Sequence, residues 1–231
     1  DARRARGDDD AILVRQVLRR GAFIVVFGLL LASFPWFPVT RITEMRFPGV
    51  LQRIGLAYTC GALLTLRTSW RQQLVILSAL LLGYWALMTL VPVPGYGLGP
   101  HNLDDPSASL AAWLDRTVFG SHVWRTAKTW DPEGLLSTIP AIGTVICGVF
   151  AGRWIATPRP LTERLAALYG AGSLALVAGL MWHWGFPINK NLWTSSYVVF
   201  TAGMASLALA TCLWVVDVLG ITSWTAPFRW Y

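Results

Sequence analysis

The sequence predicts an all-α protein built as a polytopic bundle of transmembrane helices, and three observations lead to this fold class. Hydrophobic residues make up 55% of the 231 residues, and the mean hydropathy is +0.51. Charged residues make up only 13%, about half of their share in soluble domains. Apolar stretches of roughly 20 residues, the length that crosses a bilayer, recur along the chain. Inside a bilayer, helices satisfy their own backbone polar groups.

About six spans are expected in this chain, within a single domain that covers residues 1–231. They lie at 17–37, 48–66, 73–93, 133–155, 163–184 and 193–216. Lys and Arg concentrate on cytoplasmic segments of membrane proteins, and 12 of the 19 lie at one set of helix ends. This asymmetry places the N-terminus and segments 67–72, 156–162 and 217–231 in the cytoplasm. The loop 94–132 is then extracytoplasmic.

The loop 94–132 is expected to contain a short amphipathic helix. It opens with turn-forming residues, "PVPGYGLGPHN". The apolar residues that then recur at helical spacing are Leu110, Trp113, Leu114 and Val118. Asp115 and Arg116 lie off this stripe, so the helix is expected to rest on the outer membrane surface or on the bundle.

Within the spans, the small-residue pair Gly148 and Gly152 predicts a close approach of two helices. Composition also argues against two functional classes. The net charge of +7 is ordinary for cytoplasmic loops, so nucleic acid is not an expected partner. Cys60, Cys147 and Cys212 fall inside apolar runs without metal-ligand spacing, so no metal site is predicted.

The stretch "RFPGVLQRIG", residues 46–55, brings a charge into an unfavourable place. Pro48 suits the first position of a helix, and Gln52 and Arg53 then lie about one turn inside it. Arg53 faces the positive end of the helix dipole, close to hydrocarbon. A carboxylate partner would relieve both problems. The alternative is that Arg53 reaches outward to the lipid headgroups.

The stretch "DPEG", residues 131–134, offers that carboxylate. Asp131 as N-cap, Pro132 at the first helical position and Glu133 in the first turn form a coherent helix start. Capping accounts well for Asp131 and less well for Glu133. An ion pair of Arg53 with Asp131 or Glu133 is therefore predicted.

A third polar cluster, "PINKNLW" at 187–193, joins two apolar runs. Irregular polar backbone at membrane depth is tolerated where it lines a water-filled cavity. Asn189, Lys190 and Asn191 could line one, or they could form a hydrated outer turn anchored by Trp193. Because three helix starts bring polar groups to one side, a shared cavity is favoured.

Six motifs in order carry a family resemblance: "RFPGVLQRIGLAY", "PGYGLGP", "AAWLDRTVFG", "DPEGLLST", "PINKNLW" with "SYV", and "VVDVLG…PF". Over residues 46–229 the chain resembles the multi-pass heparan-alpha-glucosaminide N-acetyltransferase family and its bacterial relatives. The resemblance implies a membrane enzyme without metal. It would move an acyl group, with acetyl favoured, from cytoplasmic acetyl-CoA or another acyl-CoA to a sugar amine or hydroxyl on the extracytoplasmic side.

The family's proposed catalytic histidine lies in an earlier helix, before an Arg-containing linker that resembles the start of this chain. The chain therefore looks like an internal fragment, incomplete at both ends, and the catalytic histidine is expected outside it. His101, His122 and His183 do not match the family position. By itself, the chain is expected to be catalytically silent.

The resemblance gives the polar clusters expected roles. Supporting catalytic roles are assigned to Glu133 and Asp131. The expected substrate-binding residues are Gln52, Arg53, Asn189, Lys190, Asn191 and Trp193. Amide and cationic donors of this kind bind sugar hydroxyls or a developing oxyanion.

Two other classes remain open. A transporter or flippase core for a sugar-containing substrate would bind its cargo in the same cavity without bond chemistry, but no internal repeat is evident. A purely structural membrane subunit would scatter its polar residues instead of clustering them. The expected partners are the lipid bilayer and a sugar or glycan acceptor, with a homodimer left open. A bacterial inner membrane is the expected location.

Overall fold

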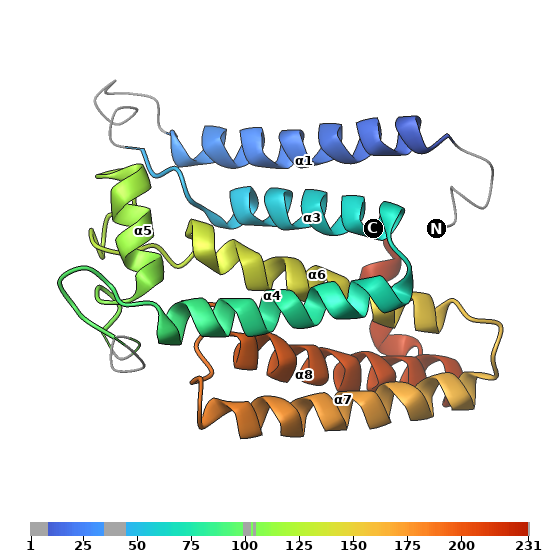
Figure 1. Ribbon diagram of the computed structural model, residues 1–231. Coiled ribbons are helices and arrows are strands. Elements are labelled where there is room, and N and C mark those ends of the chain that lie inside the picture. The colour runs from blue at the N-terminus through green and yellow to red at the C-terminus, as the bar shows by residue number, and fades with distance from the viewer. Residues whose placement is uncertain (1–8, 35–44, 99–102, 104, 231) are drawn as a thin grey trace.

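The computed structural model describes residues 9–34, 45–98, 103 and 105–230 (Figure 1). This part of the chain contains helices and, beyond them, one isolated β-bridge between Val93 and Gly97. The α-helices are α1 (Asp10–Ala32), α3 (Val50–Arg67), α4 (Trp70–Leu90), α5 (Leu110–Phe119), α6 (Leu135–Ile155), α7 (Leu161–His183) and α8 (Ser195–Leu213). A π-helical turn, η3 (Trp214–Val218), and a 3₁₀ helix, η4 (Ser223–Trp230), follow. The all-α fold class is confirmed for the described residues.

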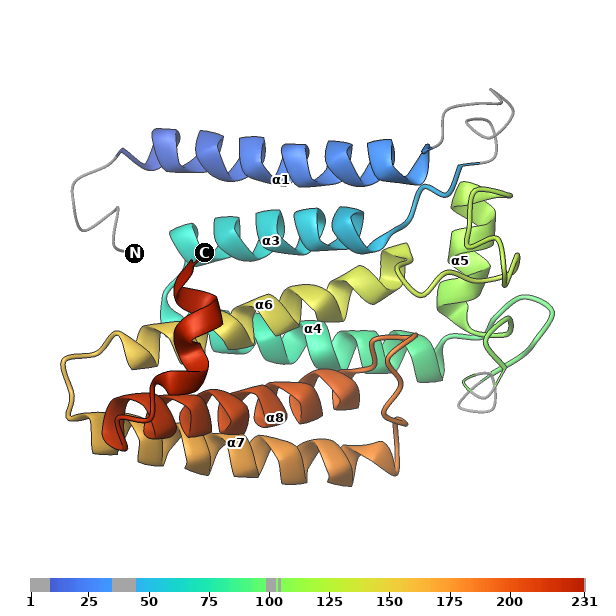
Figure 2. The same ribbon diagram turned by 180° about the vertical axis from the view of Figure 1, so that it is seen from behind.

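Six long helices lie side by side, and α5 crosses one end of the bundle (Figures 1 and 2). Helix α1 forms one edge and packs on α3, while α7 packs on α8 at the other edge. Helix α6 lies between them and contacts α3, α4 and α8. Because neighbours alternate in direction, α3, α6 and α8 all begin at the α5 end. The short helix predicted in the loop 94–132 is thus present, and it packs against α6 and α4.

Four of the described helices are long and apolar enough to cross a membrane: α4, α6, α7, and α8 continued through η3. In each, at most 28% of the most apolar 18-residue stretch is buried inside the protein. Such unburied apolar helices support an integral membrane protein.

The prediction of about six spans exceeds these four. Helix α1 exists but carries Arg15, Arg19 and Arg20 within its length. Helix α3 exists as well, and Gln52 and Arg53 reduce its apolar character. Residues 35–37 of the first predicted span lie outside the described part of the chain.

The close helix approach occurs at different glycines from those predicted. A Cβ on Gly203 of α8 would lie 2.6 Å from the backbone nitrogen of Leu176 in α7, so these two helices are in backbone contact. Gly148 and Gly152 have no neighbouring heavy atom within 4 Å of such a Cβ. That prediction is wrong because α6 turns its other side, with the buried Ile146, toward the bundle.

Candidate functional site

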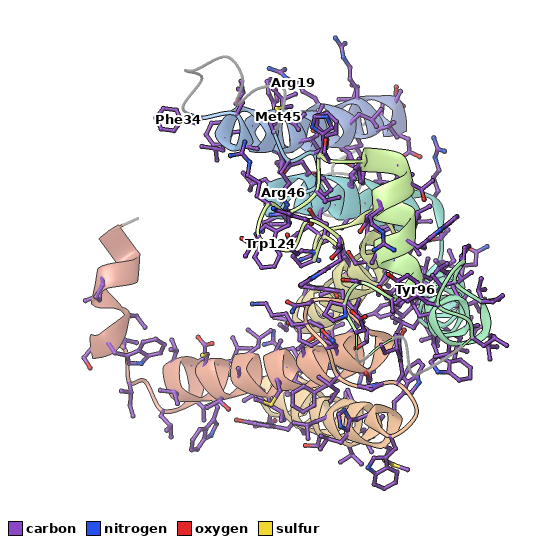
Figure 3. The ribbon with its side chains drawn as sticks, turned by 90° about the vertical axis from the view of Figure 1, so that its left-hand side faces the viewer. Arg19, Phe34, Met45, Arg46, Tyr96 and Trp124 are labelled. Atoms are coloured by element: carbon purple, nitrogen blue, oxygen red, sulfur yellow. The ribbon has the colours of Figure 1, made fainter. Side chains whose placement is uncertain are left out.

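Three charged side chains meet at the α5 end of the bundle. The Nε of Arg46 donates to Asp131 Oδ2 at 2.7 Å, and its Nη2 pairs with the second oxygen of Asp131 and with Glu133. The side chain of Asp131 is completely buried. Burial opposes the charge of Arg46, but hydrogen bonds and charge attraction from the two carboxylates outweigh it, so the pKa of Arg46 is raised. Figure 3, viewed from this end, shows Arg46 near Trp124 beside α3.

Arg53 joins this group from the first turn of α3. Its Nη2 lies 3.8 Å from Glu133 Oε1, and its Nη1 donates to the carbonyl oxygen of Pro132 at 2.9 Å. The predicted ion pair of Arg53 with Asp131 or Glu133 is therefore confirmed in the structure, with Glu133 as the partner. Arg46, Arg53, Asp131 and Glu133 form what we call the charge cluster, in which two positive and two negative formal charges cancel.

Trp193 connects the charge cluster to the segment before α8. The guanidinium of Arg53 lies over its ring, 4.0 Å from the centroid, which is a cation–π contact. The indole nitrogen donates to Thr144 Oγ1 at 3.1 Å, and the ring packs edge-on against Tyr197. Trp193 has a φ of 51°, a left-handed conformation that is uncommon for a bulky side chain. The surrounding contacts hold it there.

Helix α4 fixes the segment that carries Trp193. The hydroxyl of Tyr84 donates to the carbonyl oxygen of Leu192 at 2.6 Å. The hydroxyl of Ser195 donates to the carbonyl oxygen of Leu81 at 2.6 Å. Both hydrogen bonds are buried, so this connection is held from two sides.

The other polar residues of this segment do not join the cluster through any described contact. The side-chain oxygen of Asn189 accepts from the backbone nitrogens of Asn191 (2.8 Å) and Leu192 (3.2 Å), and so closes the turn. Lys190 and Asn191 are exposed. These contacts fit the alternative in which the segment forms a hydrated outer turn. A role of Asn189, Lys190 and Asn191 in substrate binding stays a prediction.

The start of α6 differs from the predicted helix start. The helix begins at Leu135 with Gly134 as N-cap, so Asp131 is not the cap and Pro132 is not helical. Asp131 instead accepts from the backbone nitrogen of Glu133 at 2.9 Å. The first turn receives its acceptor from another helix, because Oδ1 of Asp115 in α5 accepts from the nitrogen of Leu135 at 3.0 Å.

Asp115 is the buried carboxyl group that the sequence pattern did not single out. The face of α5 that meets the bundle consists of Ala111, Ala112 and Asp115, and Val118 of the predicted apolar stripe is 54% exposed. Asp115 is fully buried, and among the described residues its Oδ2 has no hydrogen-bond partner. Burial raises its pKa to about 7; the bond from Leu135 opposes this, and the charge of Asp131 adds to it. Ala111 and Ala112 precede Asp115 by four and three positions, which places all three on one side of the helix, and this spacing was the signal for the packed face.

Two grooves adjoin the charge cluster, with volumes of about 330 and about 530 Å³. Gln52 and Pro48 line both. The smaller groove is mostly apolar and holds four polar side chains, which are Gln52, Arg53, Glu133 and Thr138. Added Cβ atoms on Gly28 and Gly49 would lie 2.6 and 2.5 Å from Oε1 of Gln52. Gln52 therefore packs closely between α1 and the start of α3.

Neither of the described histidines, His122 and His183, contacts the charge cluster. Nδ1 of His122 is 2.8 Å from the carbonyl oxygen of Met45, and its ring stacks on Phe47. Nδ1 of His183 accepts from the nitrogen of Ile188 at 2.9 Å. His101 lies outside the described residues. Among those residues, no group of three or more His, Cys, Asp or Glu side chains is placed to hold a metal ion.

No family model matches the chain. Over an alignment of 275 residues, however, the chain is 30% identical to the heparan-alpha-glucosaminide N-acetyltransferase of Homo sapiens. The corresponding identity with the Mus musculus protein is 28%. The predicted family resemblance is confirmed. Both alignments cover 96% of this chain and 41% of the relative. The chain thus spans about two fifths of the length of these N-acetyltransferases.

Proposed function

We propose that this chain forms part of a transmembrane acyltransferase. The enzyme would transfer an acyl group, in the first instance acetyl, from cytoplasmic acyl-CoA to a sugar amine or hydroxyl on the extracytoplasmic side. The similarity to N-acetyltransferases supports the reaction class, and the four long apolar helices support the membrane location. The observation that carries the proposal is the junction of the charge cluster with Trp193, beside a groove of about 330 Å³.

The arrangement suits acyl transfer because negative charge develops on the thioester carbonyl oxygen as the acceptor attacks. Cationic donors fixed in place before the reaction stabilise such charge strongly. Arg53 is fixed by Pro132, Glu133 and Trp193, and it lines the groove together with Gln52. Its remaining N–H groups and the amide of Gln52 are the donors we assign to the acyl oxygen or the sugar hydroxyls.

Glu133 has a different role in this scheme. It lies between the guanidinium groups of Arg46 and Arg53 and pairs with both. We assign it to orienting Arg53 and to accepting a hydrogen bond from the acceptor sugar, with Asp131 anchoring Arg46. The base that takes the acceptor's proton is then a group outside the charge cluster.

Acetyl transfer tests the proposal directly. The protein is expressed together with any sequence that flanks this chain in its own gene. Membranes that contain it are incubated with labelled acetyl-CoA and a glucosamine-terminated acceptor. We expect labelled acetylated sugar, and a loss of about 100-fold or more in kcat/KM for Glu133→Gln. Glu163→Gln is the matched control, because Glu163 is exposed and pairs with Arg159 near the start of α7.

Three results would count against the proposal. They are no acetylated product from correctly inserted protein, equal rates for the two variants, and sugar uptake without acylation. The last would favour a transporter. The 231-residue chain by itself should be inactive, because neither His122 nor His183 contacts the charge cluster. Robust transfer by the isolated chain would contradict that expectation.

The charge asymmetry supports a cytoplasmic N-terminus, and we include this orientation in the proposal. A bacterial inner membrane and a possible homodimer remain predictions from the resemblance.

A further inference from the structure

A third groove lies at the end of the bundle opposite α5. Helices α1 and α3 are in close contact at Gly21, where an added Cβ would lie 1.9 Å from Oγ1 of Thr59. Beyond this contact, toward the start of α1 and the end of α3, the two helices border an open groove of about 760 Å³. Figures 1 and 2 show these two helix ends side by side. Its lining includes Asp10, Val14, Arg15, Arg19, Leu66 and Arg67.

The groove combines three cations with an apolar lining. Among the described residues, Arg15, Arg19 and Arg67 line the groove together with one acidic residue, Asp10, so the formal charges of these four residues sum to +2. Guanidinium groups bind phosphate through paired hydrogen bonds and lose hydration more readily than ammonium groups. An anion that also carries apolar groups is the ligand that this lining fits.

The surface next to the groove indicates what those apolar groups are. Helix α1 makes its main contacts with α3 alone among the described elements. Along its length it exposes large apolar side chains, among them Phe23 (60%) and Phe27 (59%). In a membrane protein this surface lies against lipid acyl chains. The guanidinium of Arg19 lies over the ring of Phe23, where the basic and apolar surfaces meet.

We propose that this groove binds one anionic glycerophospholipid, with its phosphate on Arg15, Arg19 and Arg67 and its acyl chains along α1. The formal charge of the lining selects an anionic lipid over a zwitterionic one. A choline headgroup would bring a further cation beside three arginines, whereas a glycerol headgroup would not. The site lies at the opposite end of the bundle from the charge cluster and does not depend on the proposed reaction.

The experiment measures lipid retention and stabilisation of the purified full chain. Protein in neutral detergent is mixed with phosphatidylglycerol or phosphatidylcholine, and bound lipid is counted by native mass spectrometry. The unfolding midpoint is followed in parallel. We expect one retained phosphatidylglycerol, and at least a tenfold weaker apparent affinity in the double variant Arg15→Gln, Arg67→Gln. All the exchanged side chains are exposed, so the variant should fold.

The control removes the same charge elsewhere at this end of the bundle. Arg71 lies over Trp70 and Arg159 pairs with Glu163, and neither lines the groove. The double variant Arg71→Gln, Arg159→Gln should retain the lipid. Equal retention of the two lipids, or equal loss in both double variants, would overturn the proposal. Displacement of the lipid by coenzyme A, which carries phosphates without acyl chains, would assign the groove to a soluble phosphate ligand instead.

Discussion

At the scale of single residues, Arg46 compensates the negative charge of the buried Asp131. The side chain of Asp131 is completely buried and accepts two hydrogen bonds from Arg46. Removing one partner of a buried ion pair leaves an uncompensated charge, which costs about 3–5 kcal/mol. Arg46→Ala should therefore lower the free energy of unfolding in mixed micelles by about that amount.

The comparison variant is Arg159→Ala, which removes an arginine from an exposed pair with Glu163. Exposed pairs contribute about 0–1 kcal/mol, so this variant should unfold nearly like the wild type. Similar losses for the two variants would show that Asp131 finds another partner when Arg46 is removed.

Asp115 should make the stability of the protein depend on pH. Its pKa is raised from 3.8 to about 7 in the folded state. Between these values the folded protein holds a proton that the unfolded chain has released, so the free energy of unfolding falls as the pH rises. The effect is complete above about pH 7. The charges of Asp131, Arg116 and Arg46 act on the same carboxyl group.

Asp115→Asn tests this dependence, because the amide oxygen can still accept from Leu135 while the side chain stays neutral. The difference in unfolding free energy between variant and wild type should grow from pH 4 to pH 7, in the variant's favour. Two parallel stability curves would mean that Asp115 is already ionised in the folded protein across this range.

The sequence was sufficient to predict the pairing of Arg53, because a charge in the first turn of an apolar helix needs a partner. It was not sufficient for Arg46, which precedes α3 in a segment without periodicity and so has no predictable direction. Asp115 was missed for another reason. The stripe was drawn through the large apolar residues of α5, whereas the helix packs through Ala111 and Ala112.

At the scale of elements, α5 and α6 pack closely because Gly134, at the start of α6, has no side chain and leaves room for Asp115 of α5. A Cβ on Gly134 would lie 1.9 Å from Oδ2 of Asp115. The backbone of Gly134 has φ −65° and ψ 176°, which any residue can adopt. Gly134→Ala therefore tests only the steric effect of the added methyl group, without backbone strain. It should displace Asp115 from the first turn of α6 and lower the unfolding free energy by about 1–3 kcal/mol.

Gly148→Ala serves as its control within the same helix. Apart from the neighbouring backbone of α6 itself, no described heavy atom lies within 4 Å of an added Cβ there, and alanine in a helix interior is favoured over glycine by about 0.5–1 kcal/mol. Its stability should stay equal or rise. If Gly134→Ala were as stable as Gly148→Ala, the contact between Asp115 and the start of α6 would not constrain this end of the bundle.

Most helix boundaries followed from apolar run lengths, and the helix predicted at 163–184 spans Leu161–His183. The first span is the exception, because α1 begins at Asp10 and not at residue 17. Two features did not follow. The side-chain acceptor at the start of α6 comes from Asp115, 20 residues earlier, and local sequence rules cannot identify such an acceptor. The pair Gly148 and Gly152 matched a packing motif, but its spacing does not say which side of α6 faces a neighbour.

At the scale of the whole molecule, alternation of helix direction explains why the polar residues converge. Helices α3, α6 and α8 begin at the end of the bundle that α5 crosses (Figure 1). Arg53, Glu133 and Trp193 lie near these three starts, so residues that are 140 positions apart (193 − 53) come into contact. The arginines of the groove between α1 and α3 lie at the other end.

This arrangement makes the orientation in the membrane testable. Ser121 is exposed in the turn after α5, and Arg159 is exposed in the connection between α6 and α7. Cys60, Cys147 and Cys212 are free, so they are first replaced by alanine. In intact cells, a membrane-impermeant maleimide should then label Ser121→Cys, while Arg159→Cys should react only after the membrane is opened. This result is expected because a bundle that spans the bilayer holds its two ends in separate compartments, and Lys and Arg favour the cytoplasmic one. Labelling of Arg159→Cys alone in intact cells would reverse the orientation and place the charge cluster in the cytoplasm. Labelling of both would show that the two ends share one compartment.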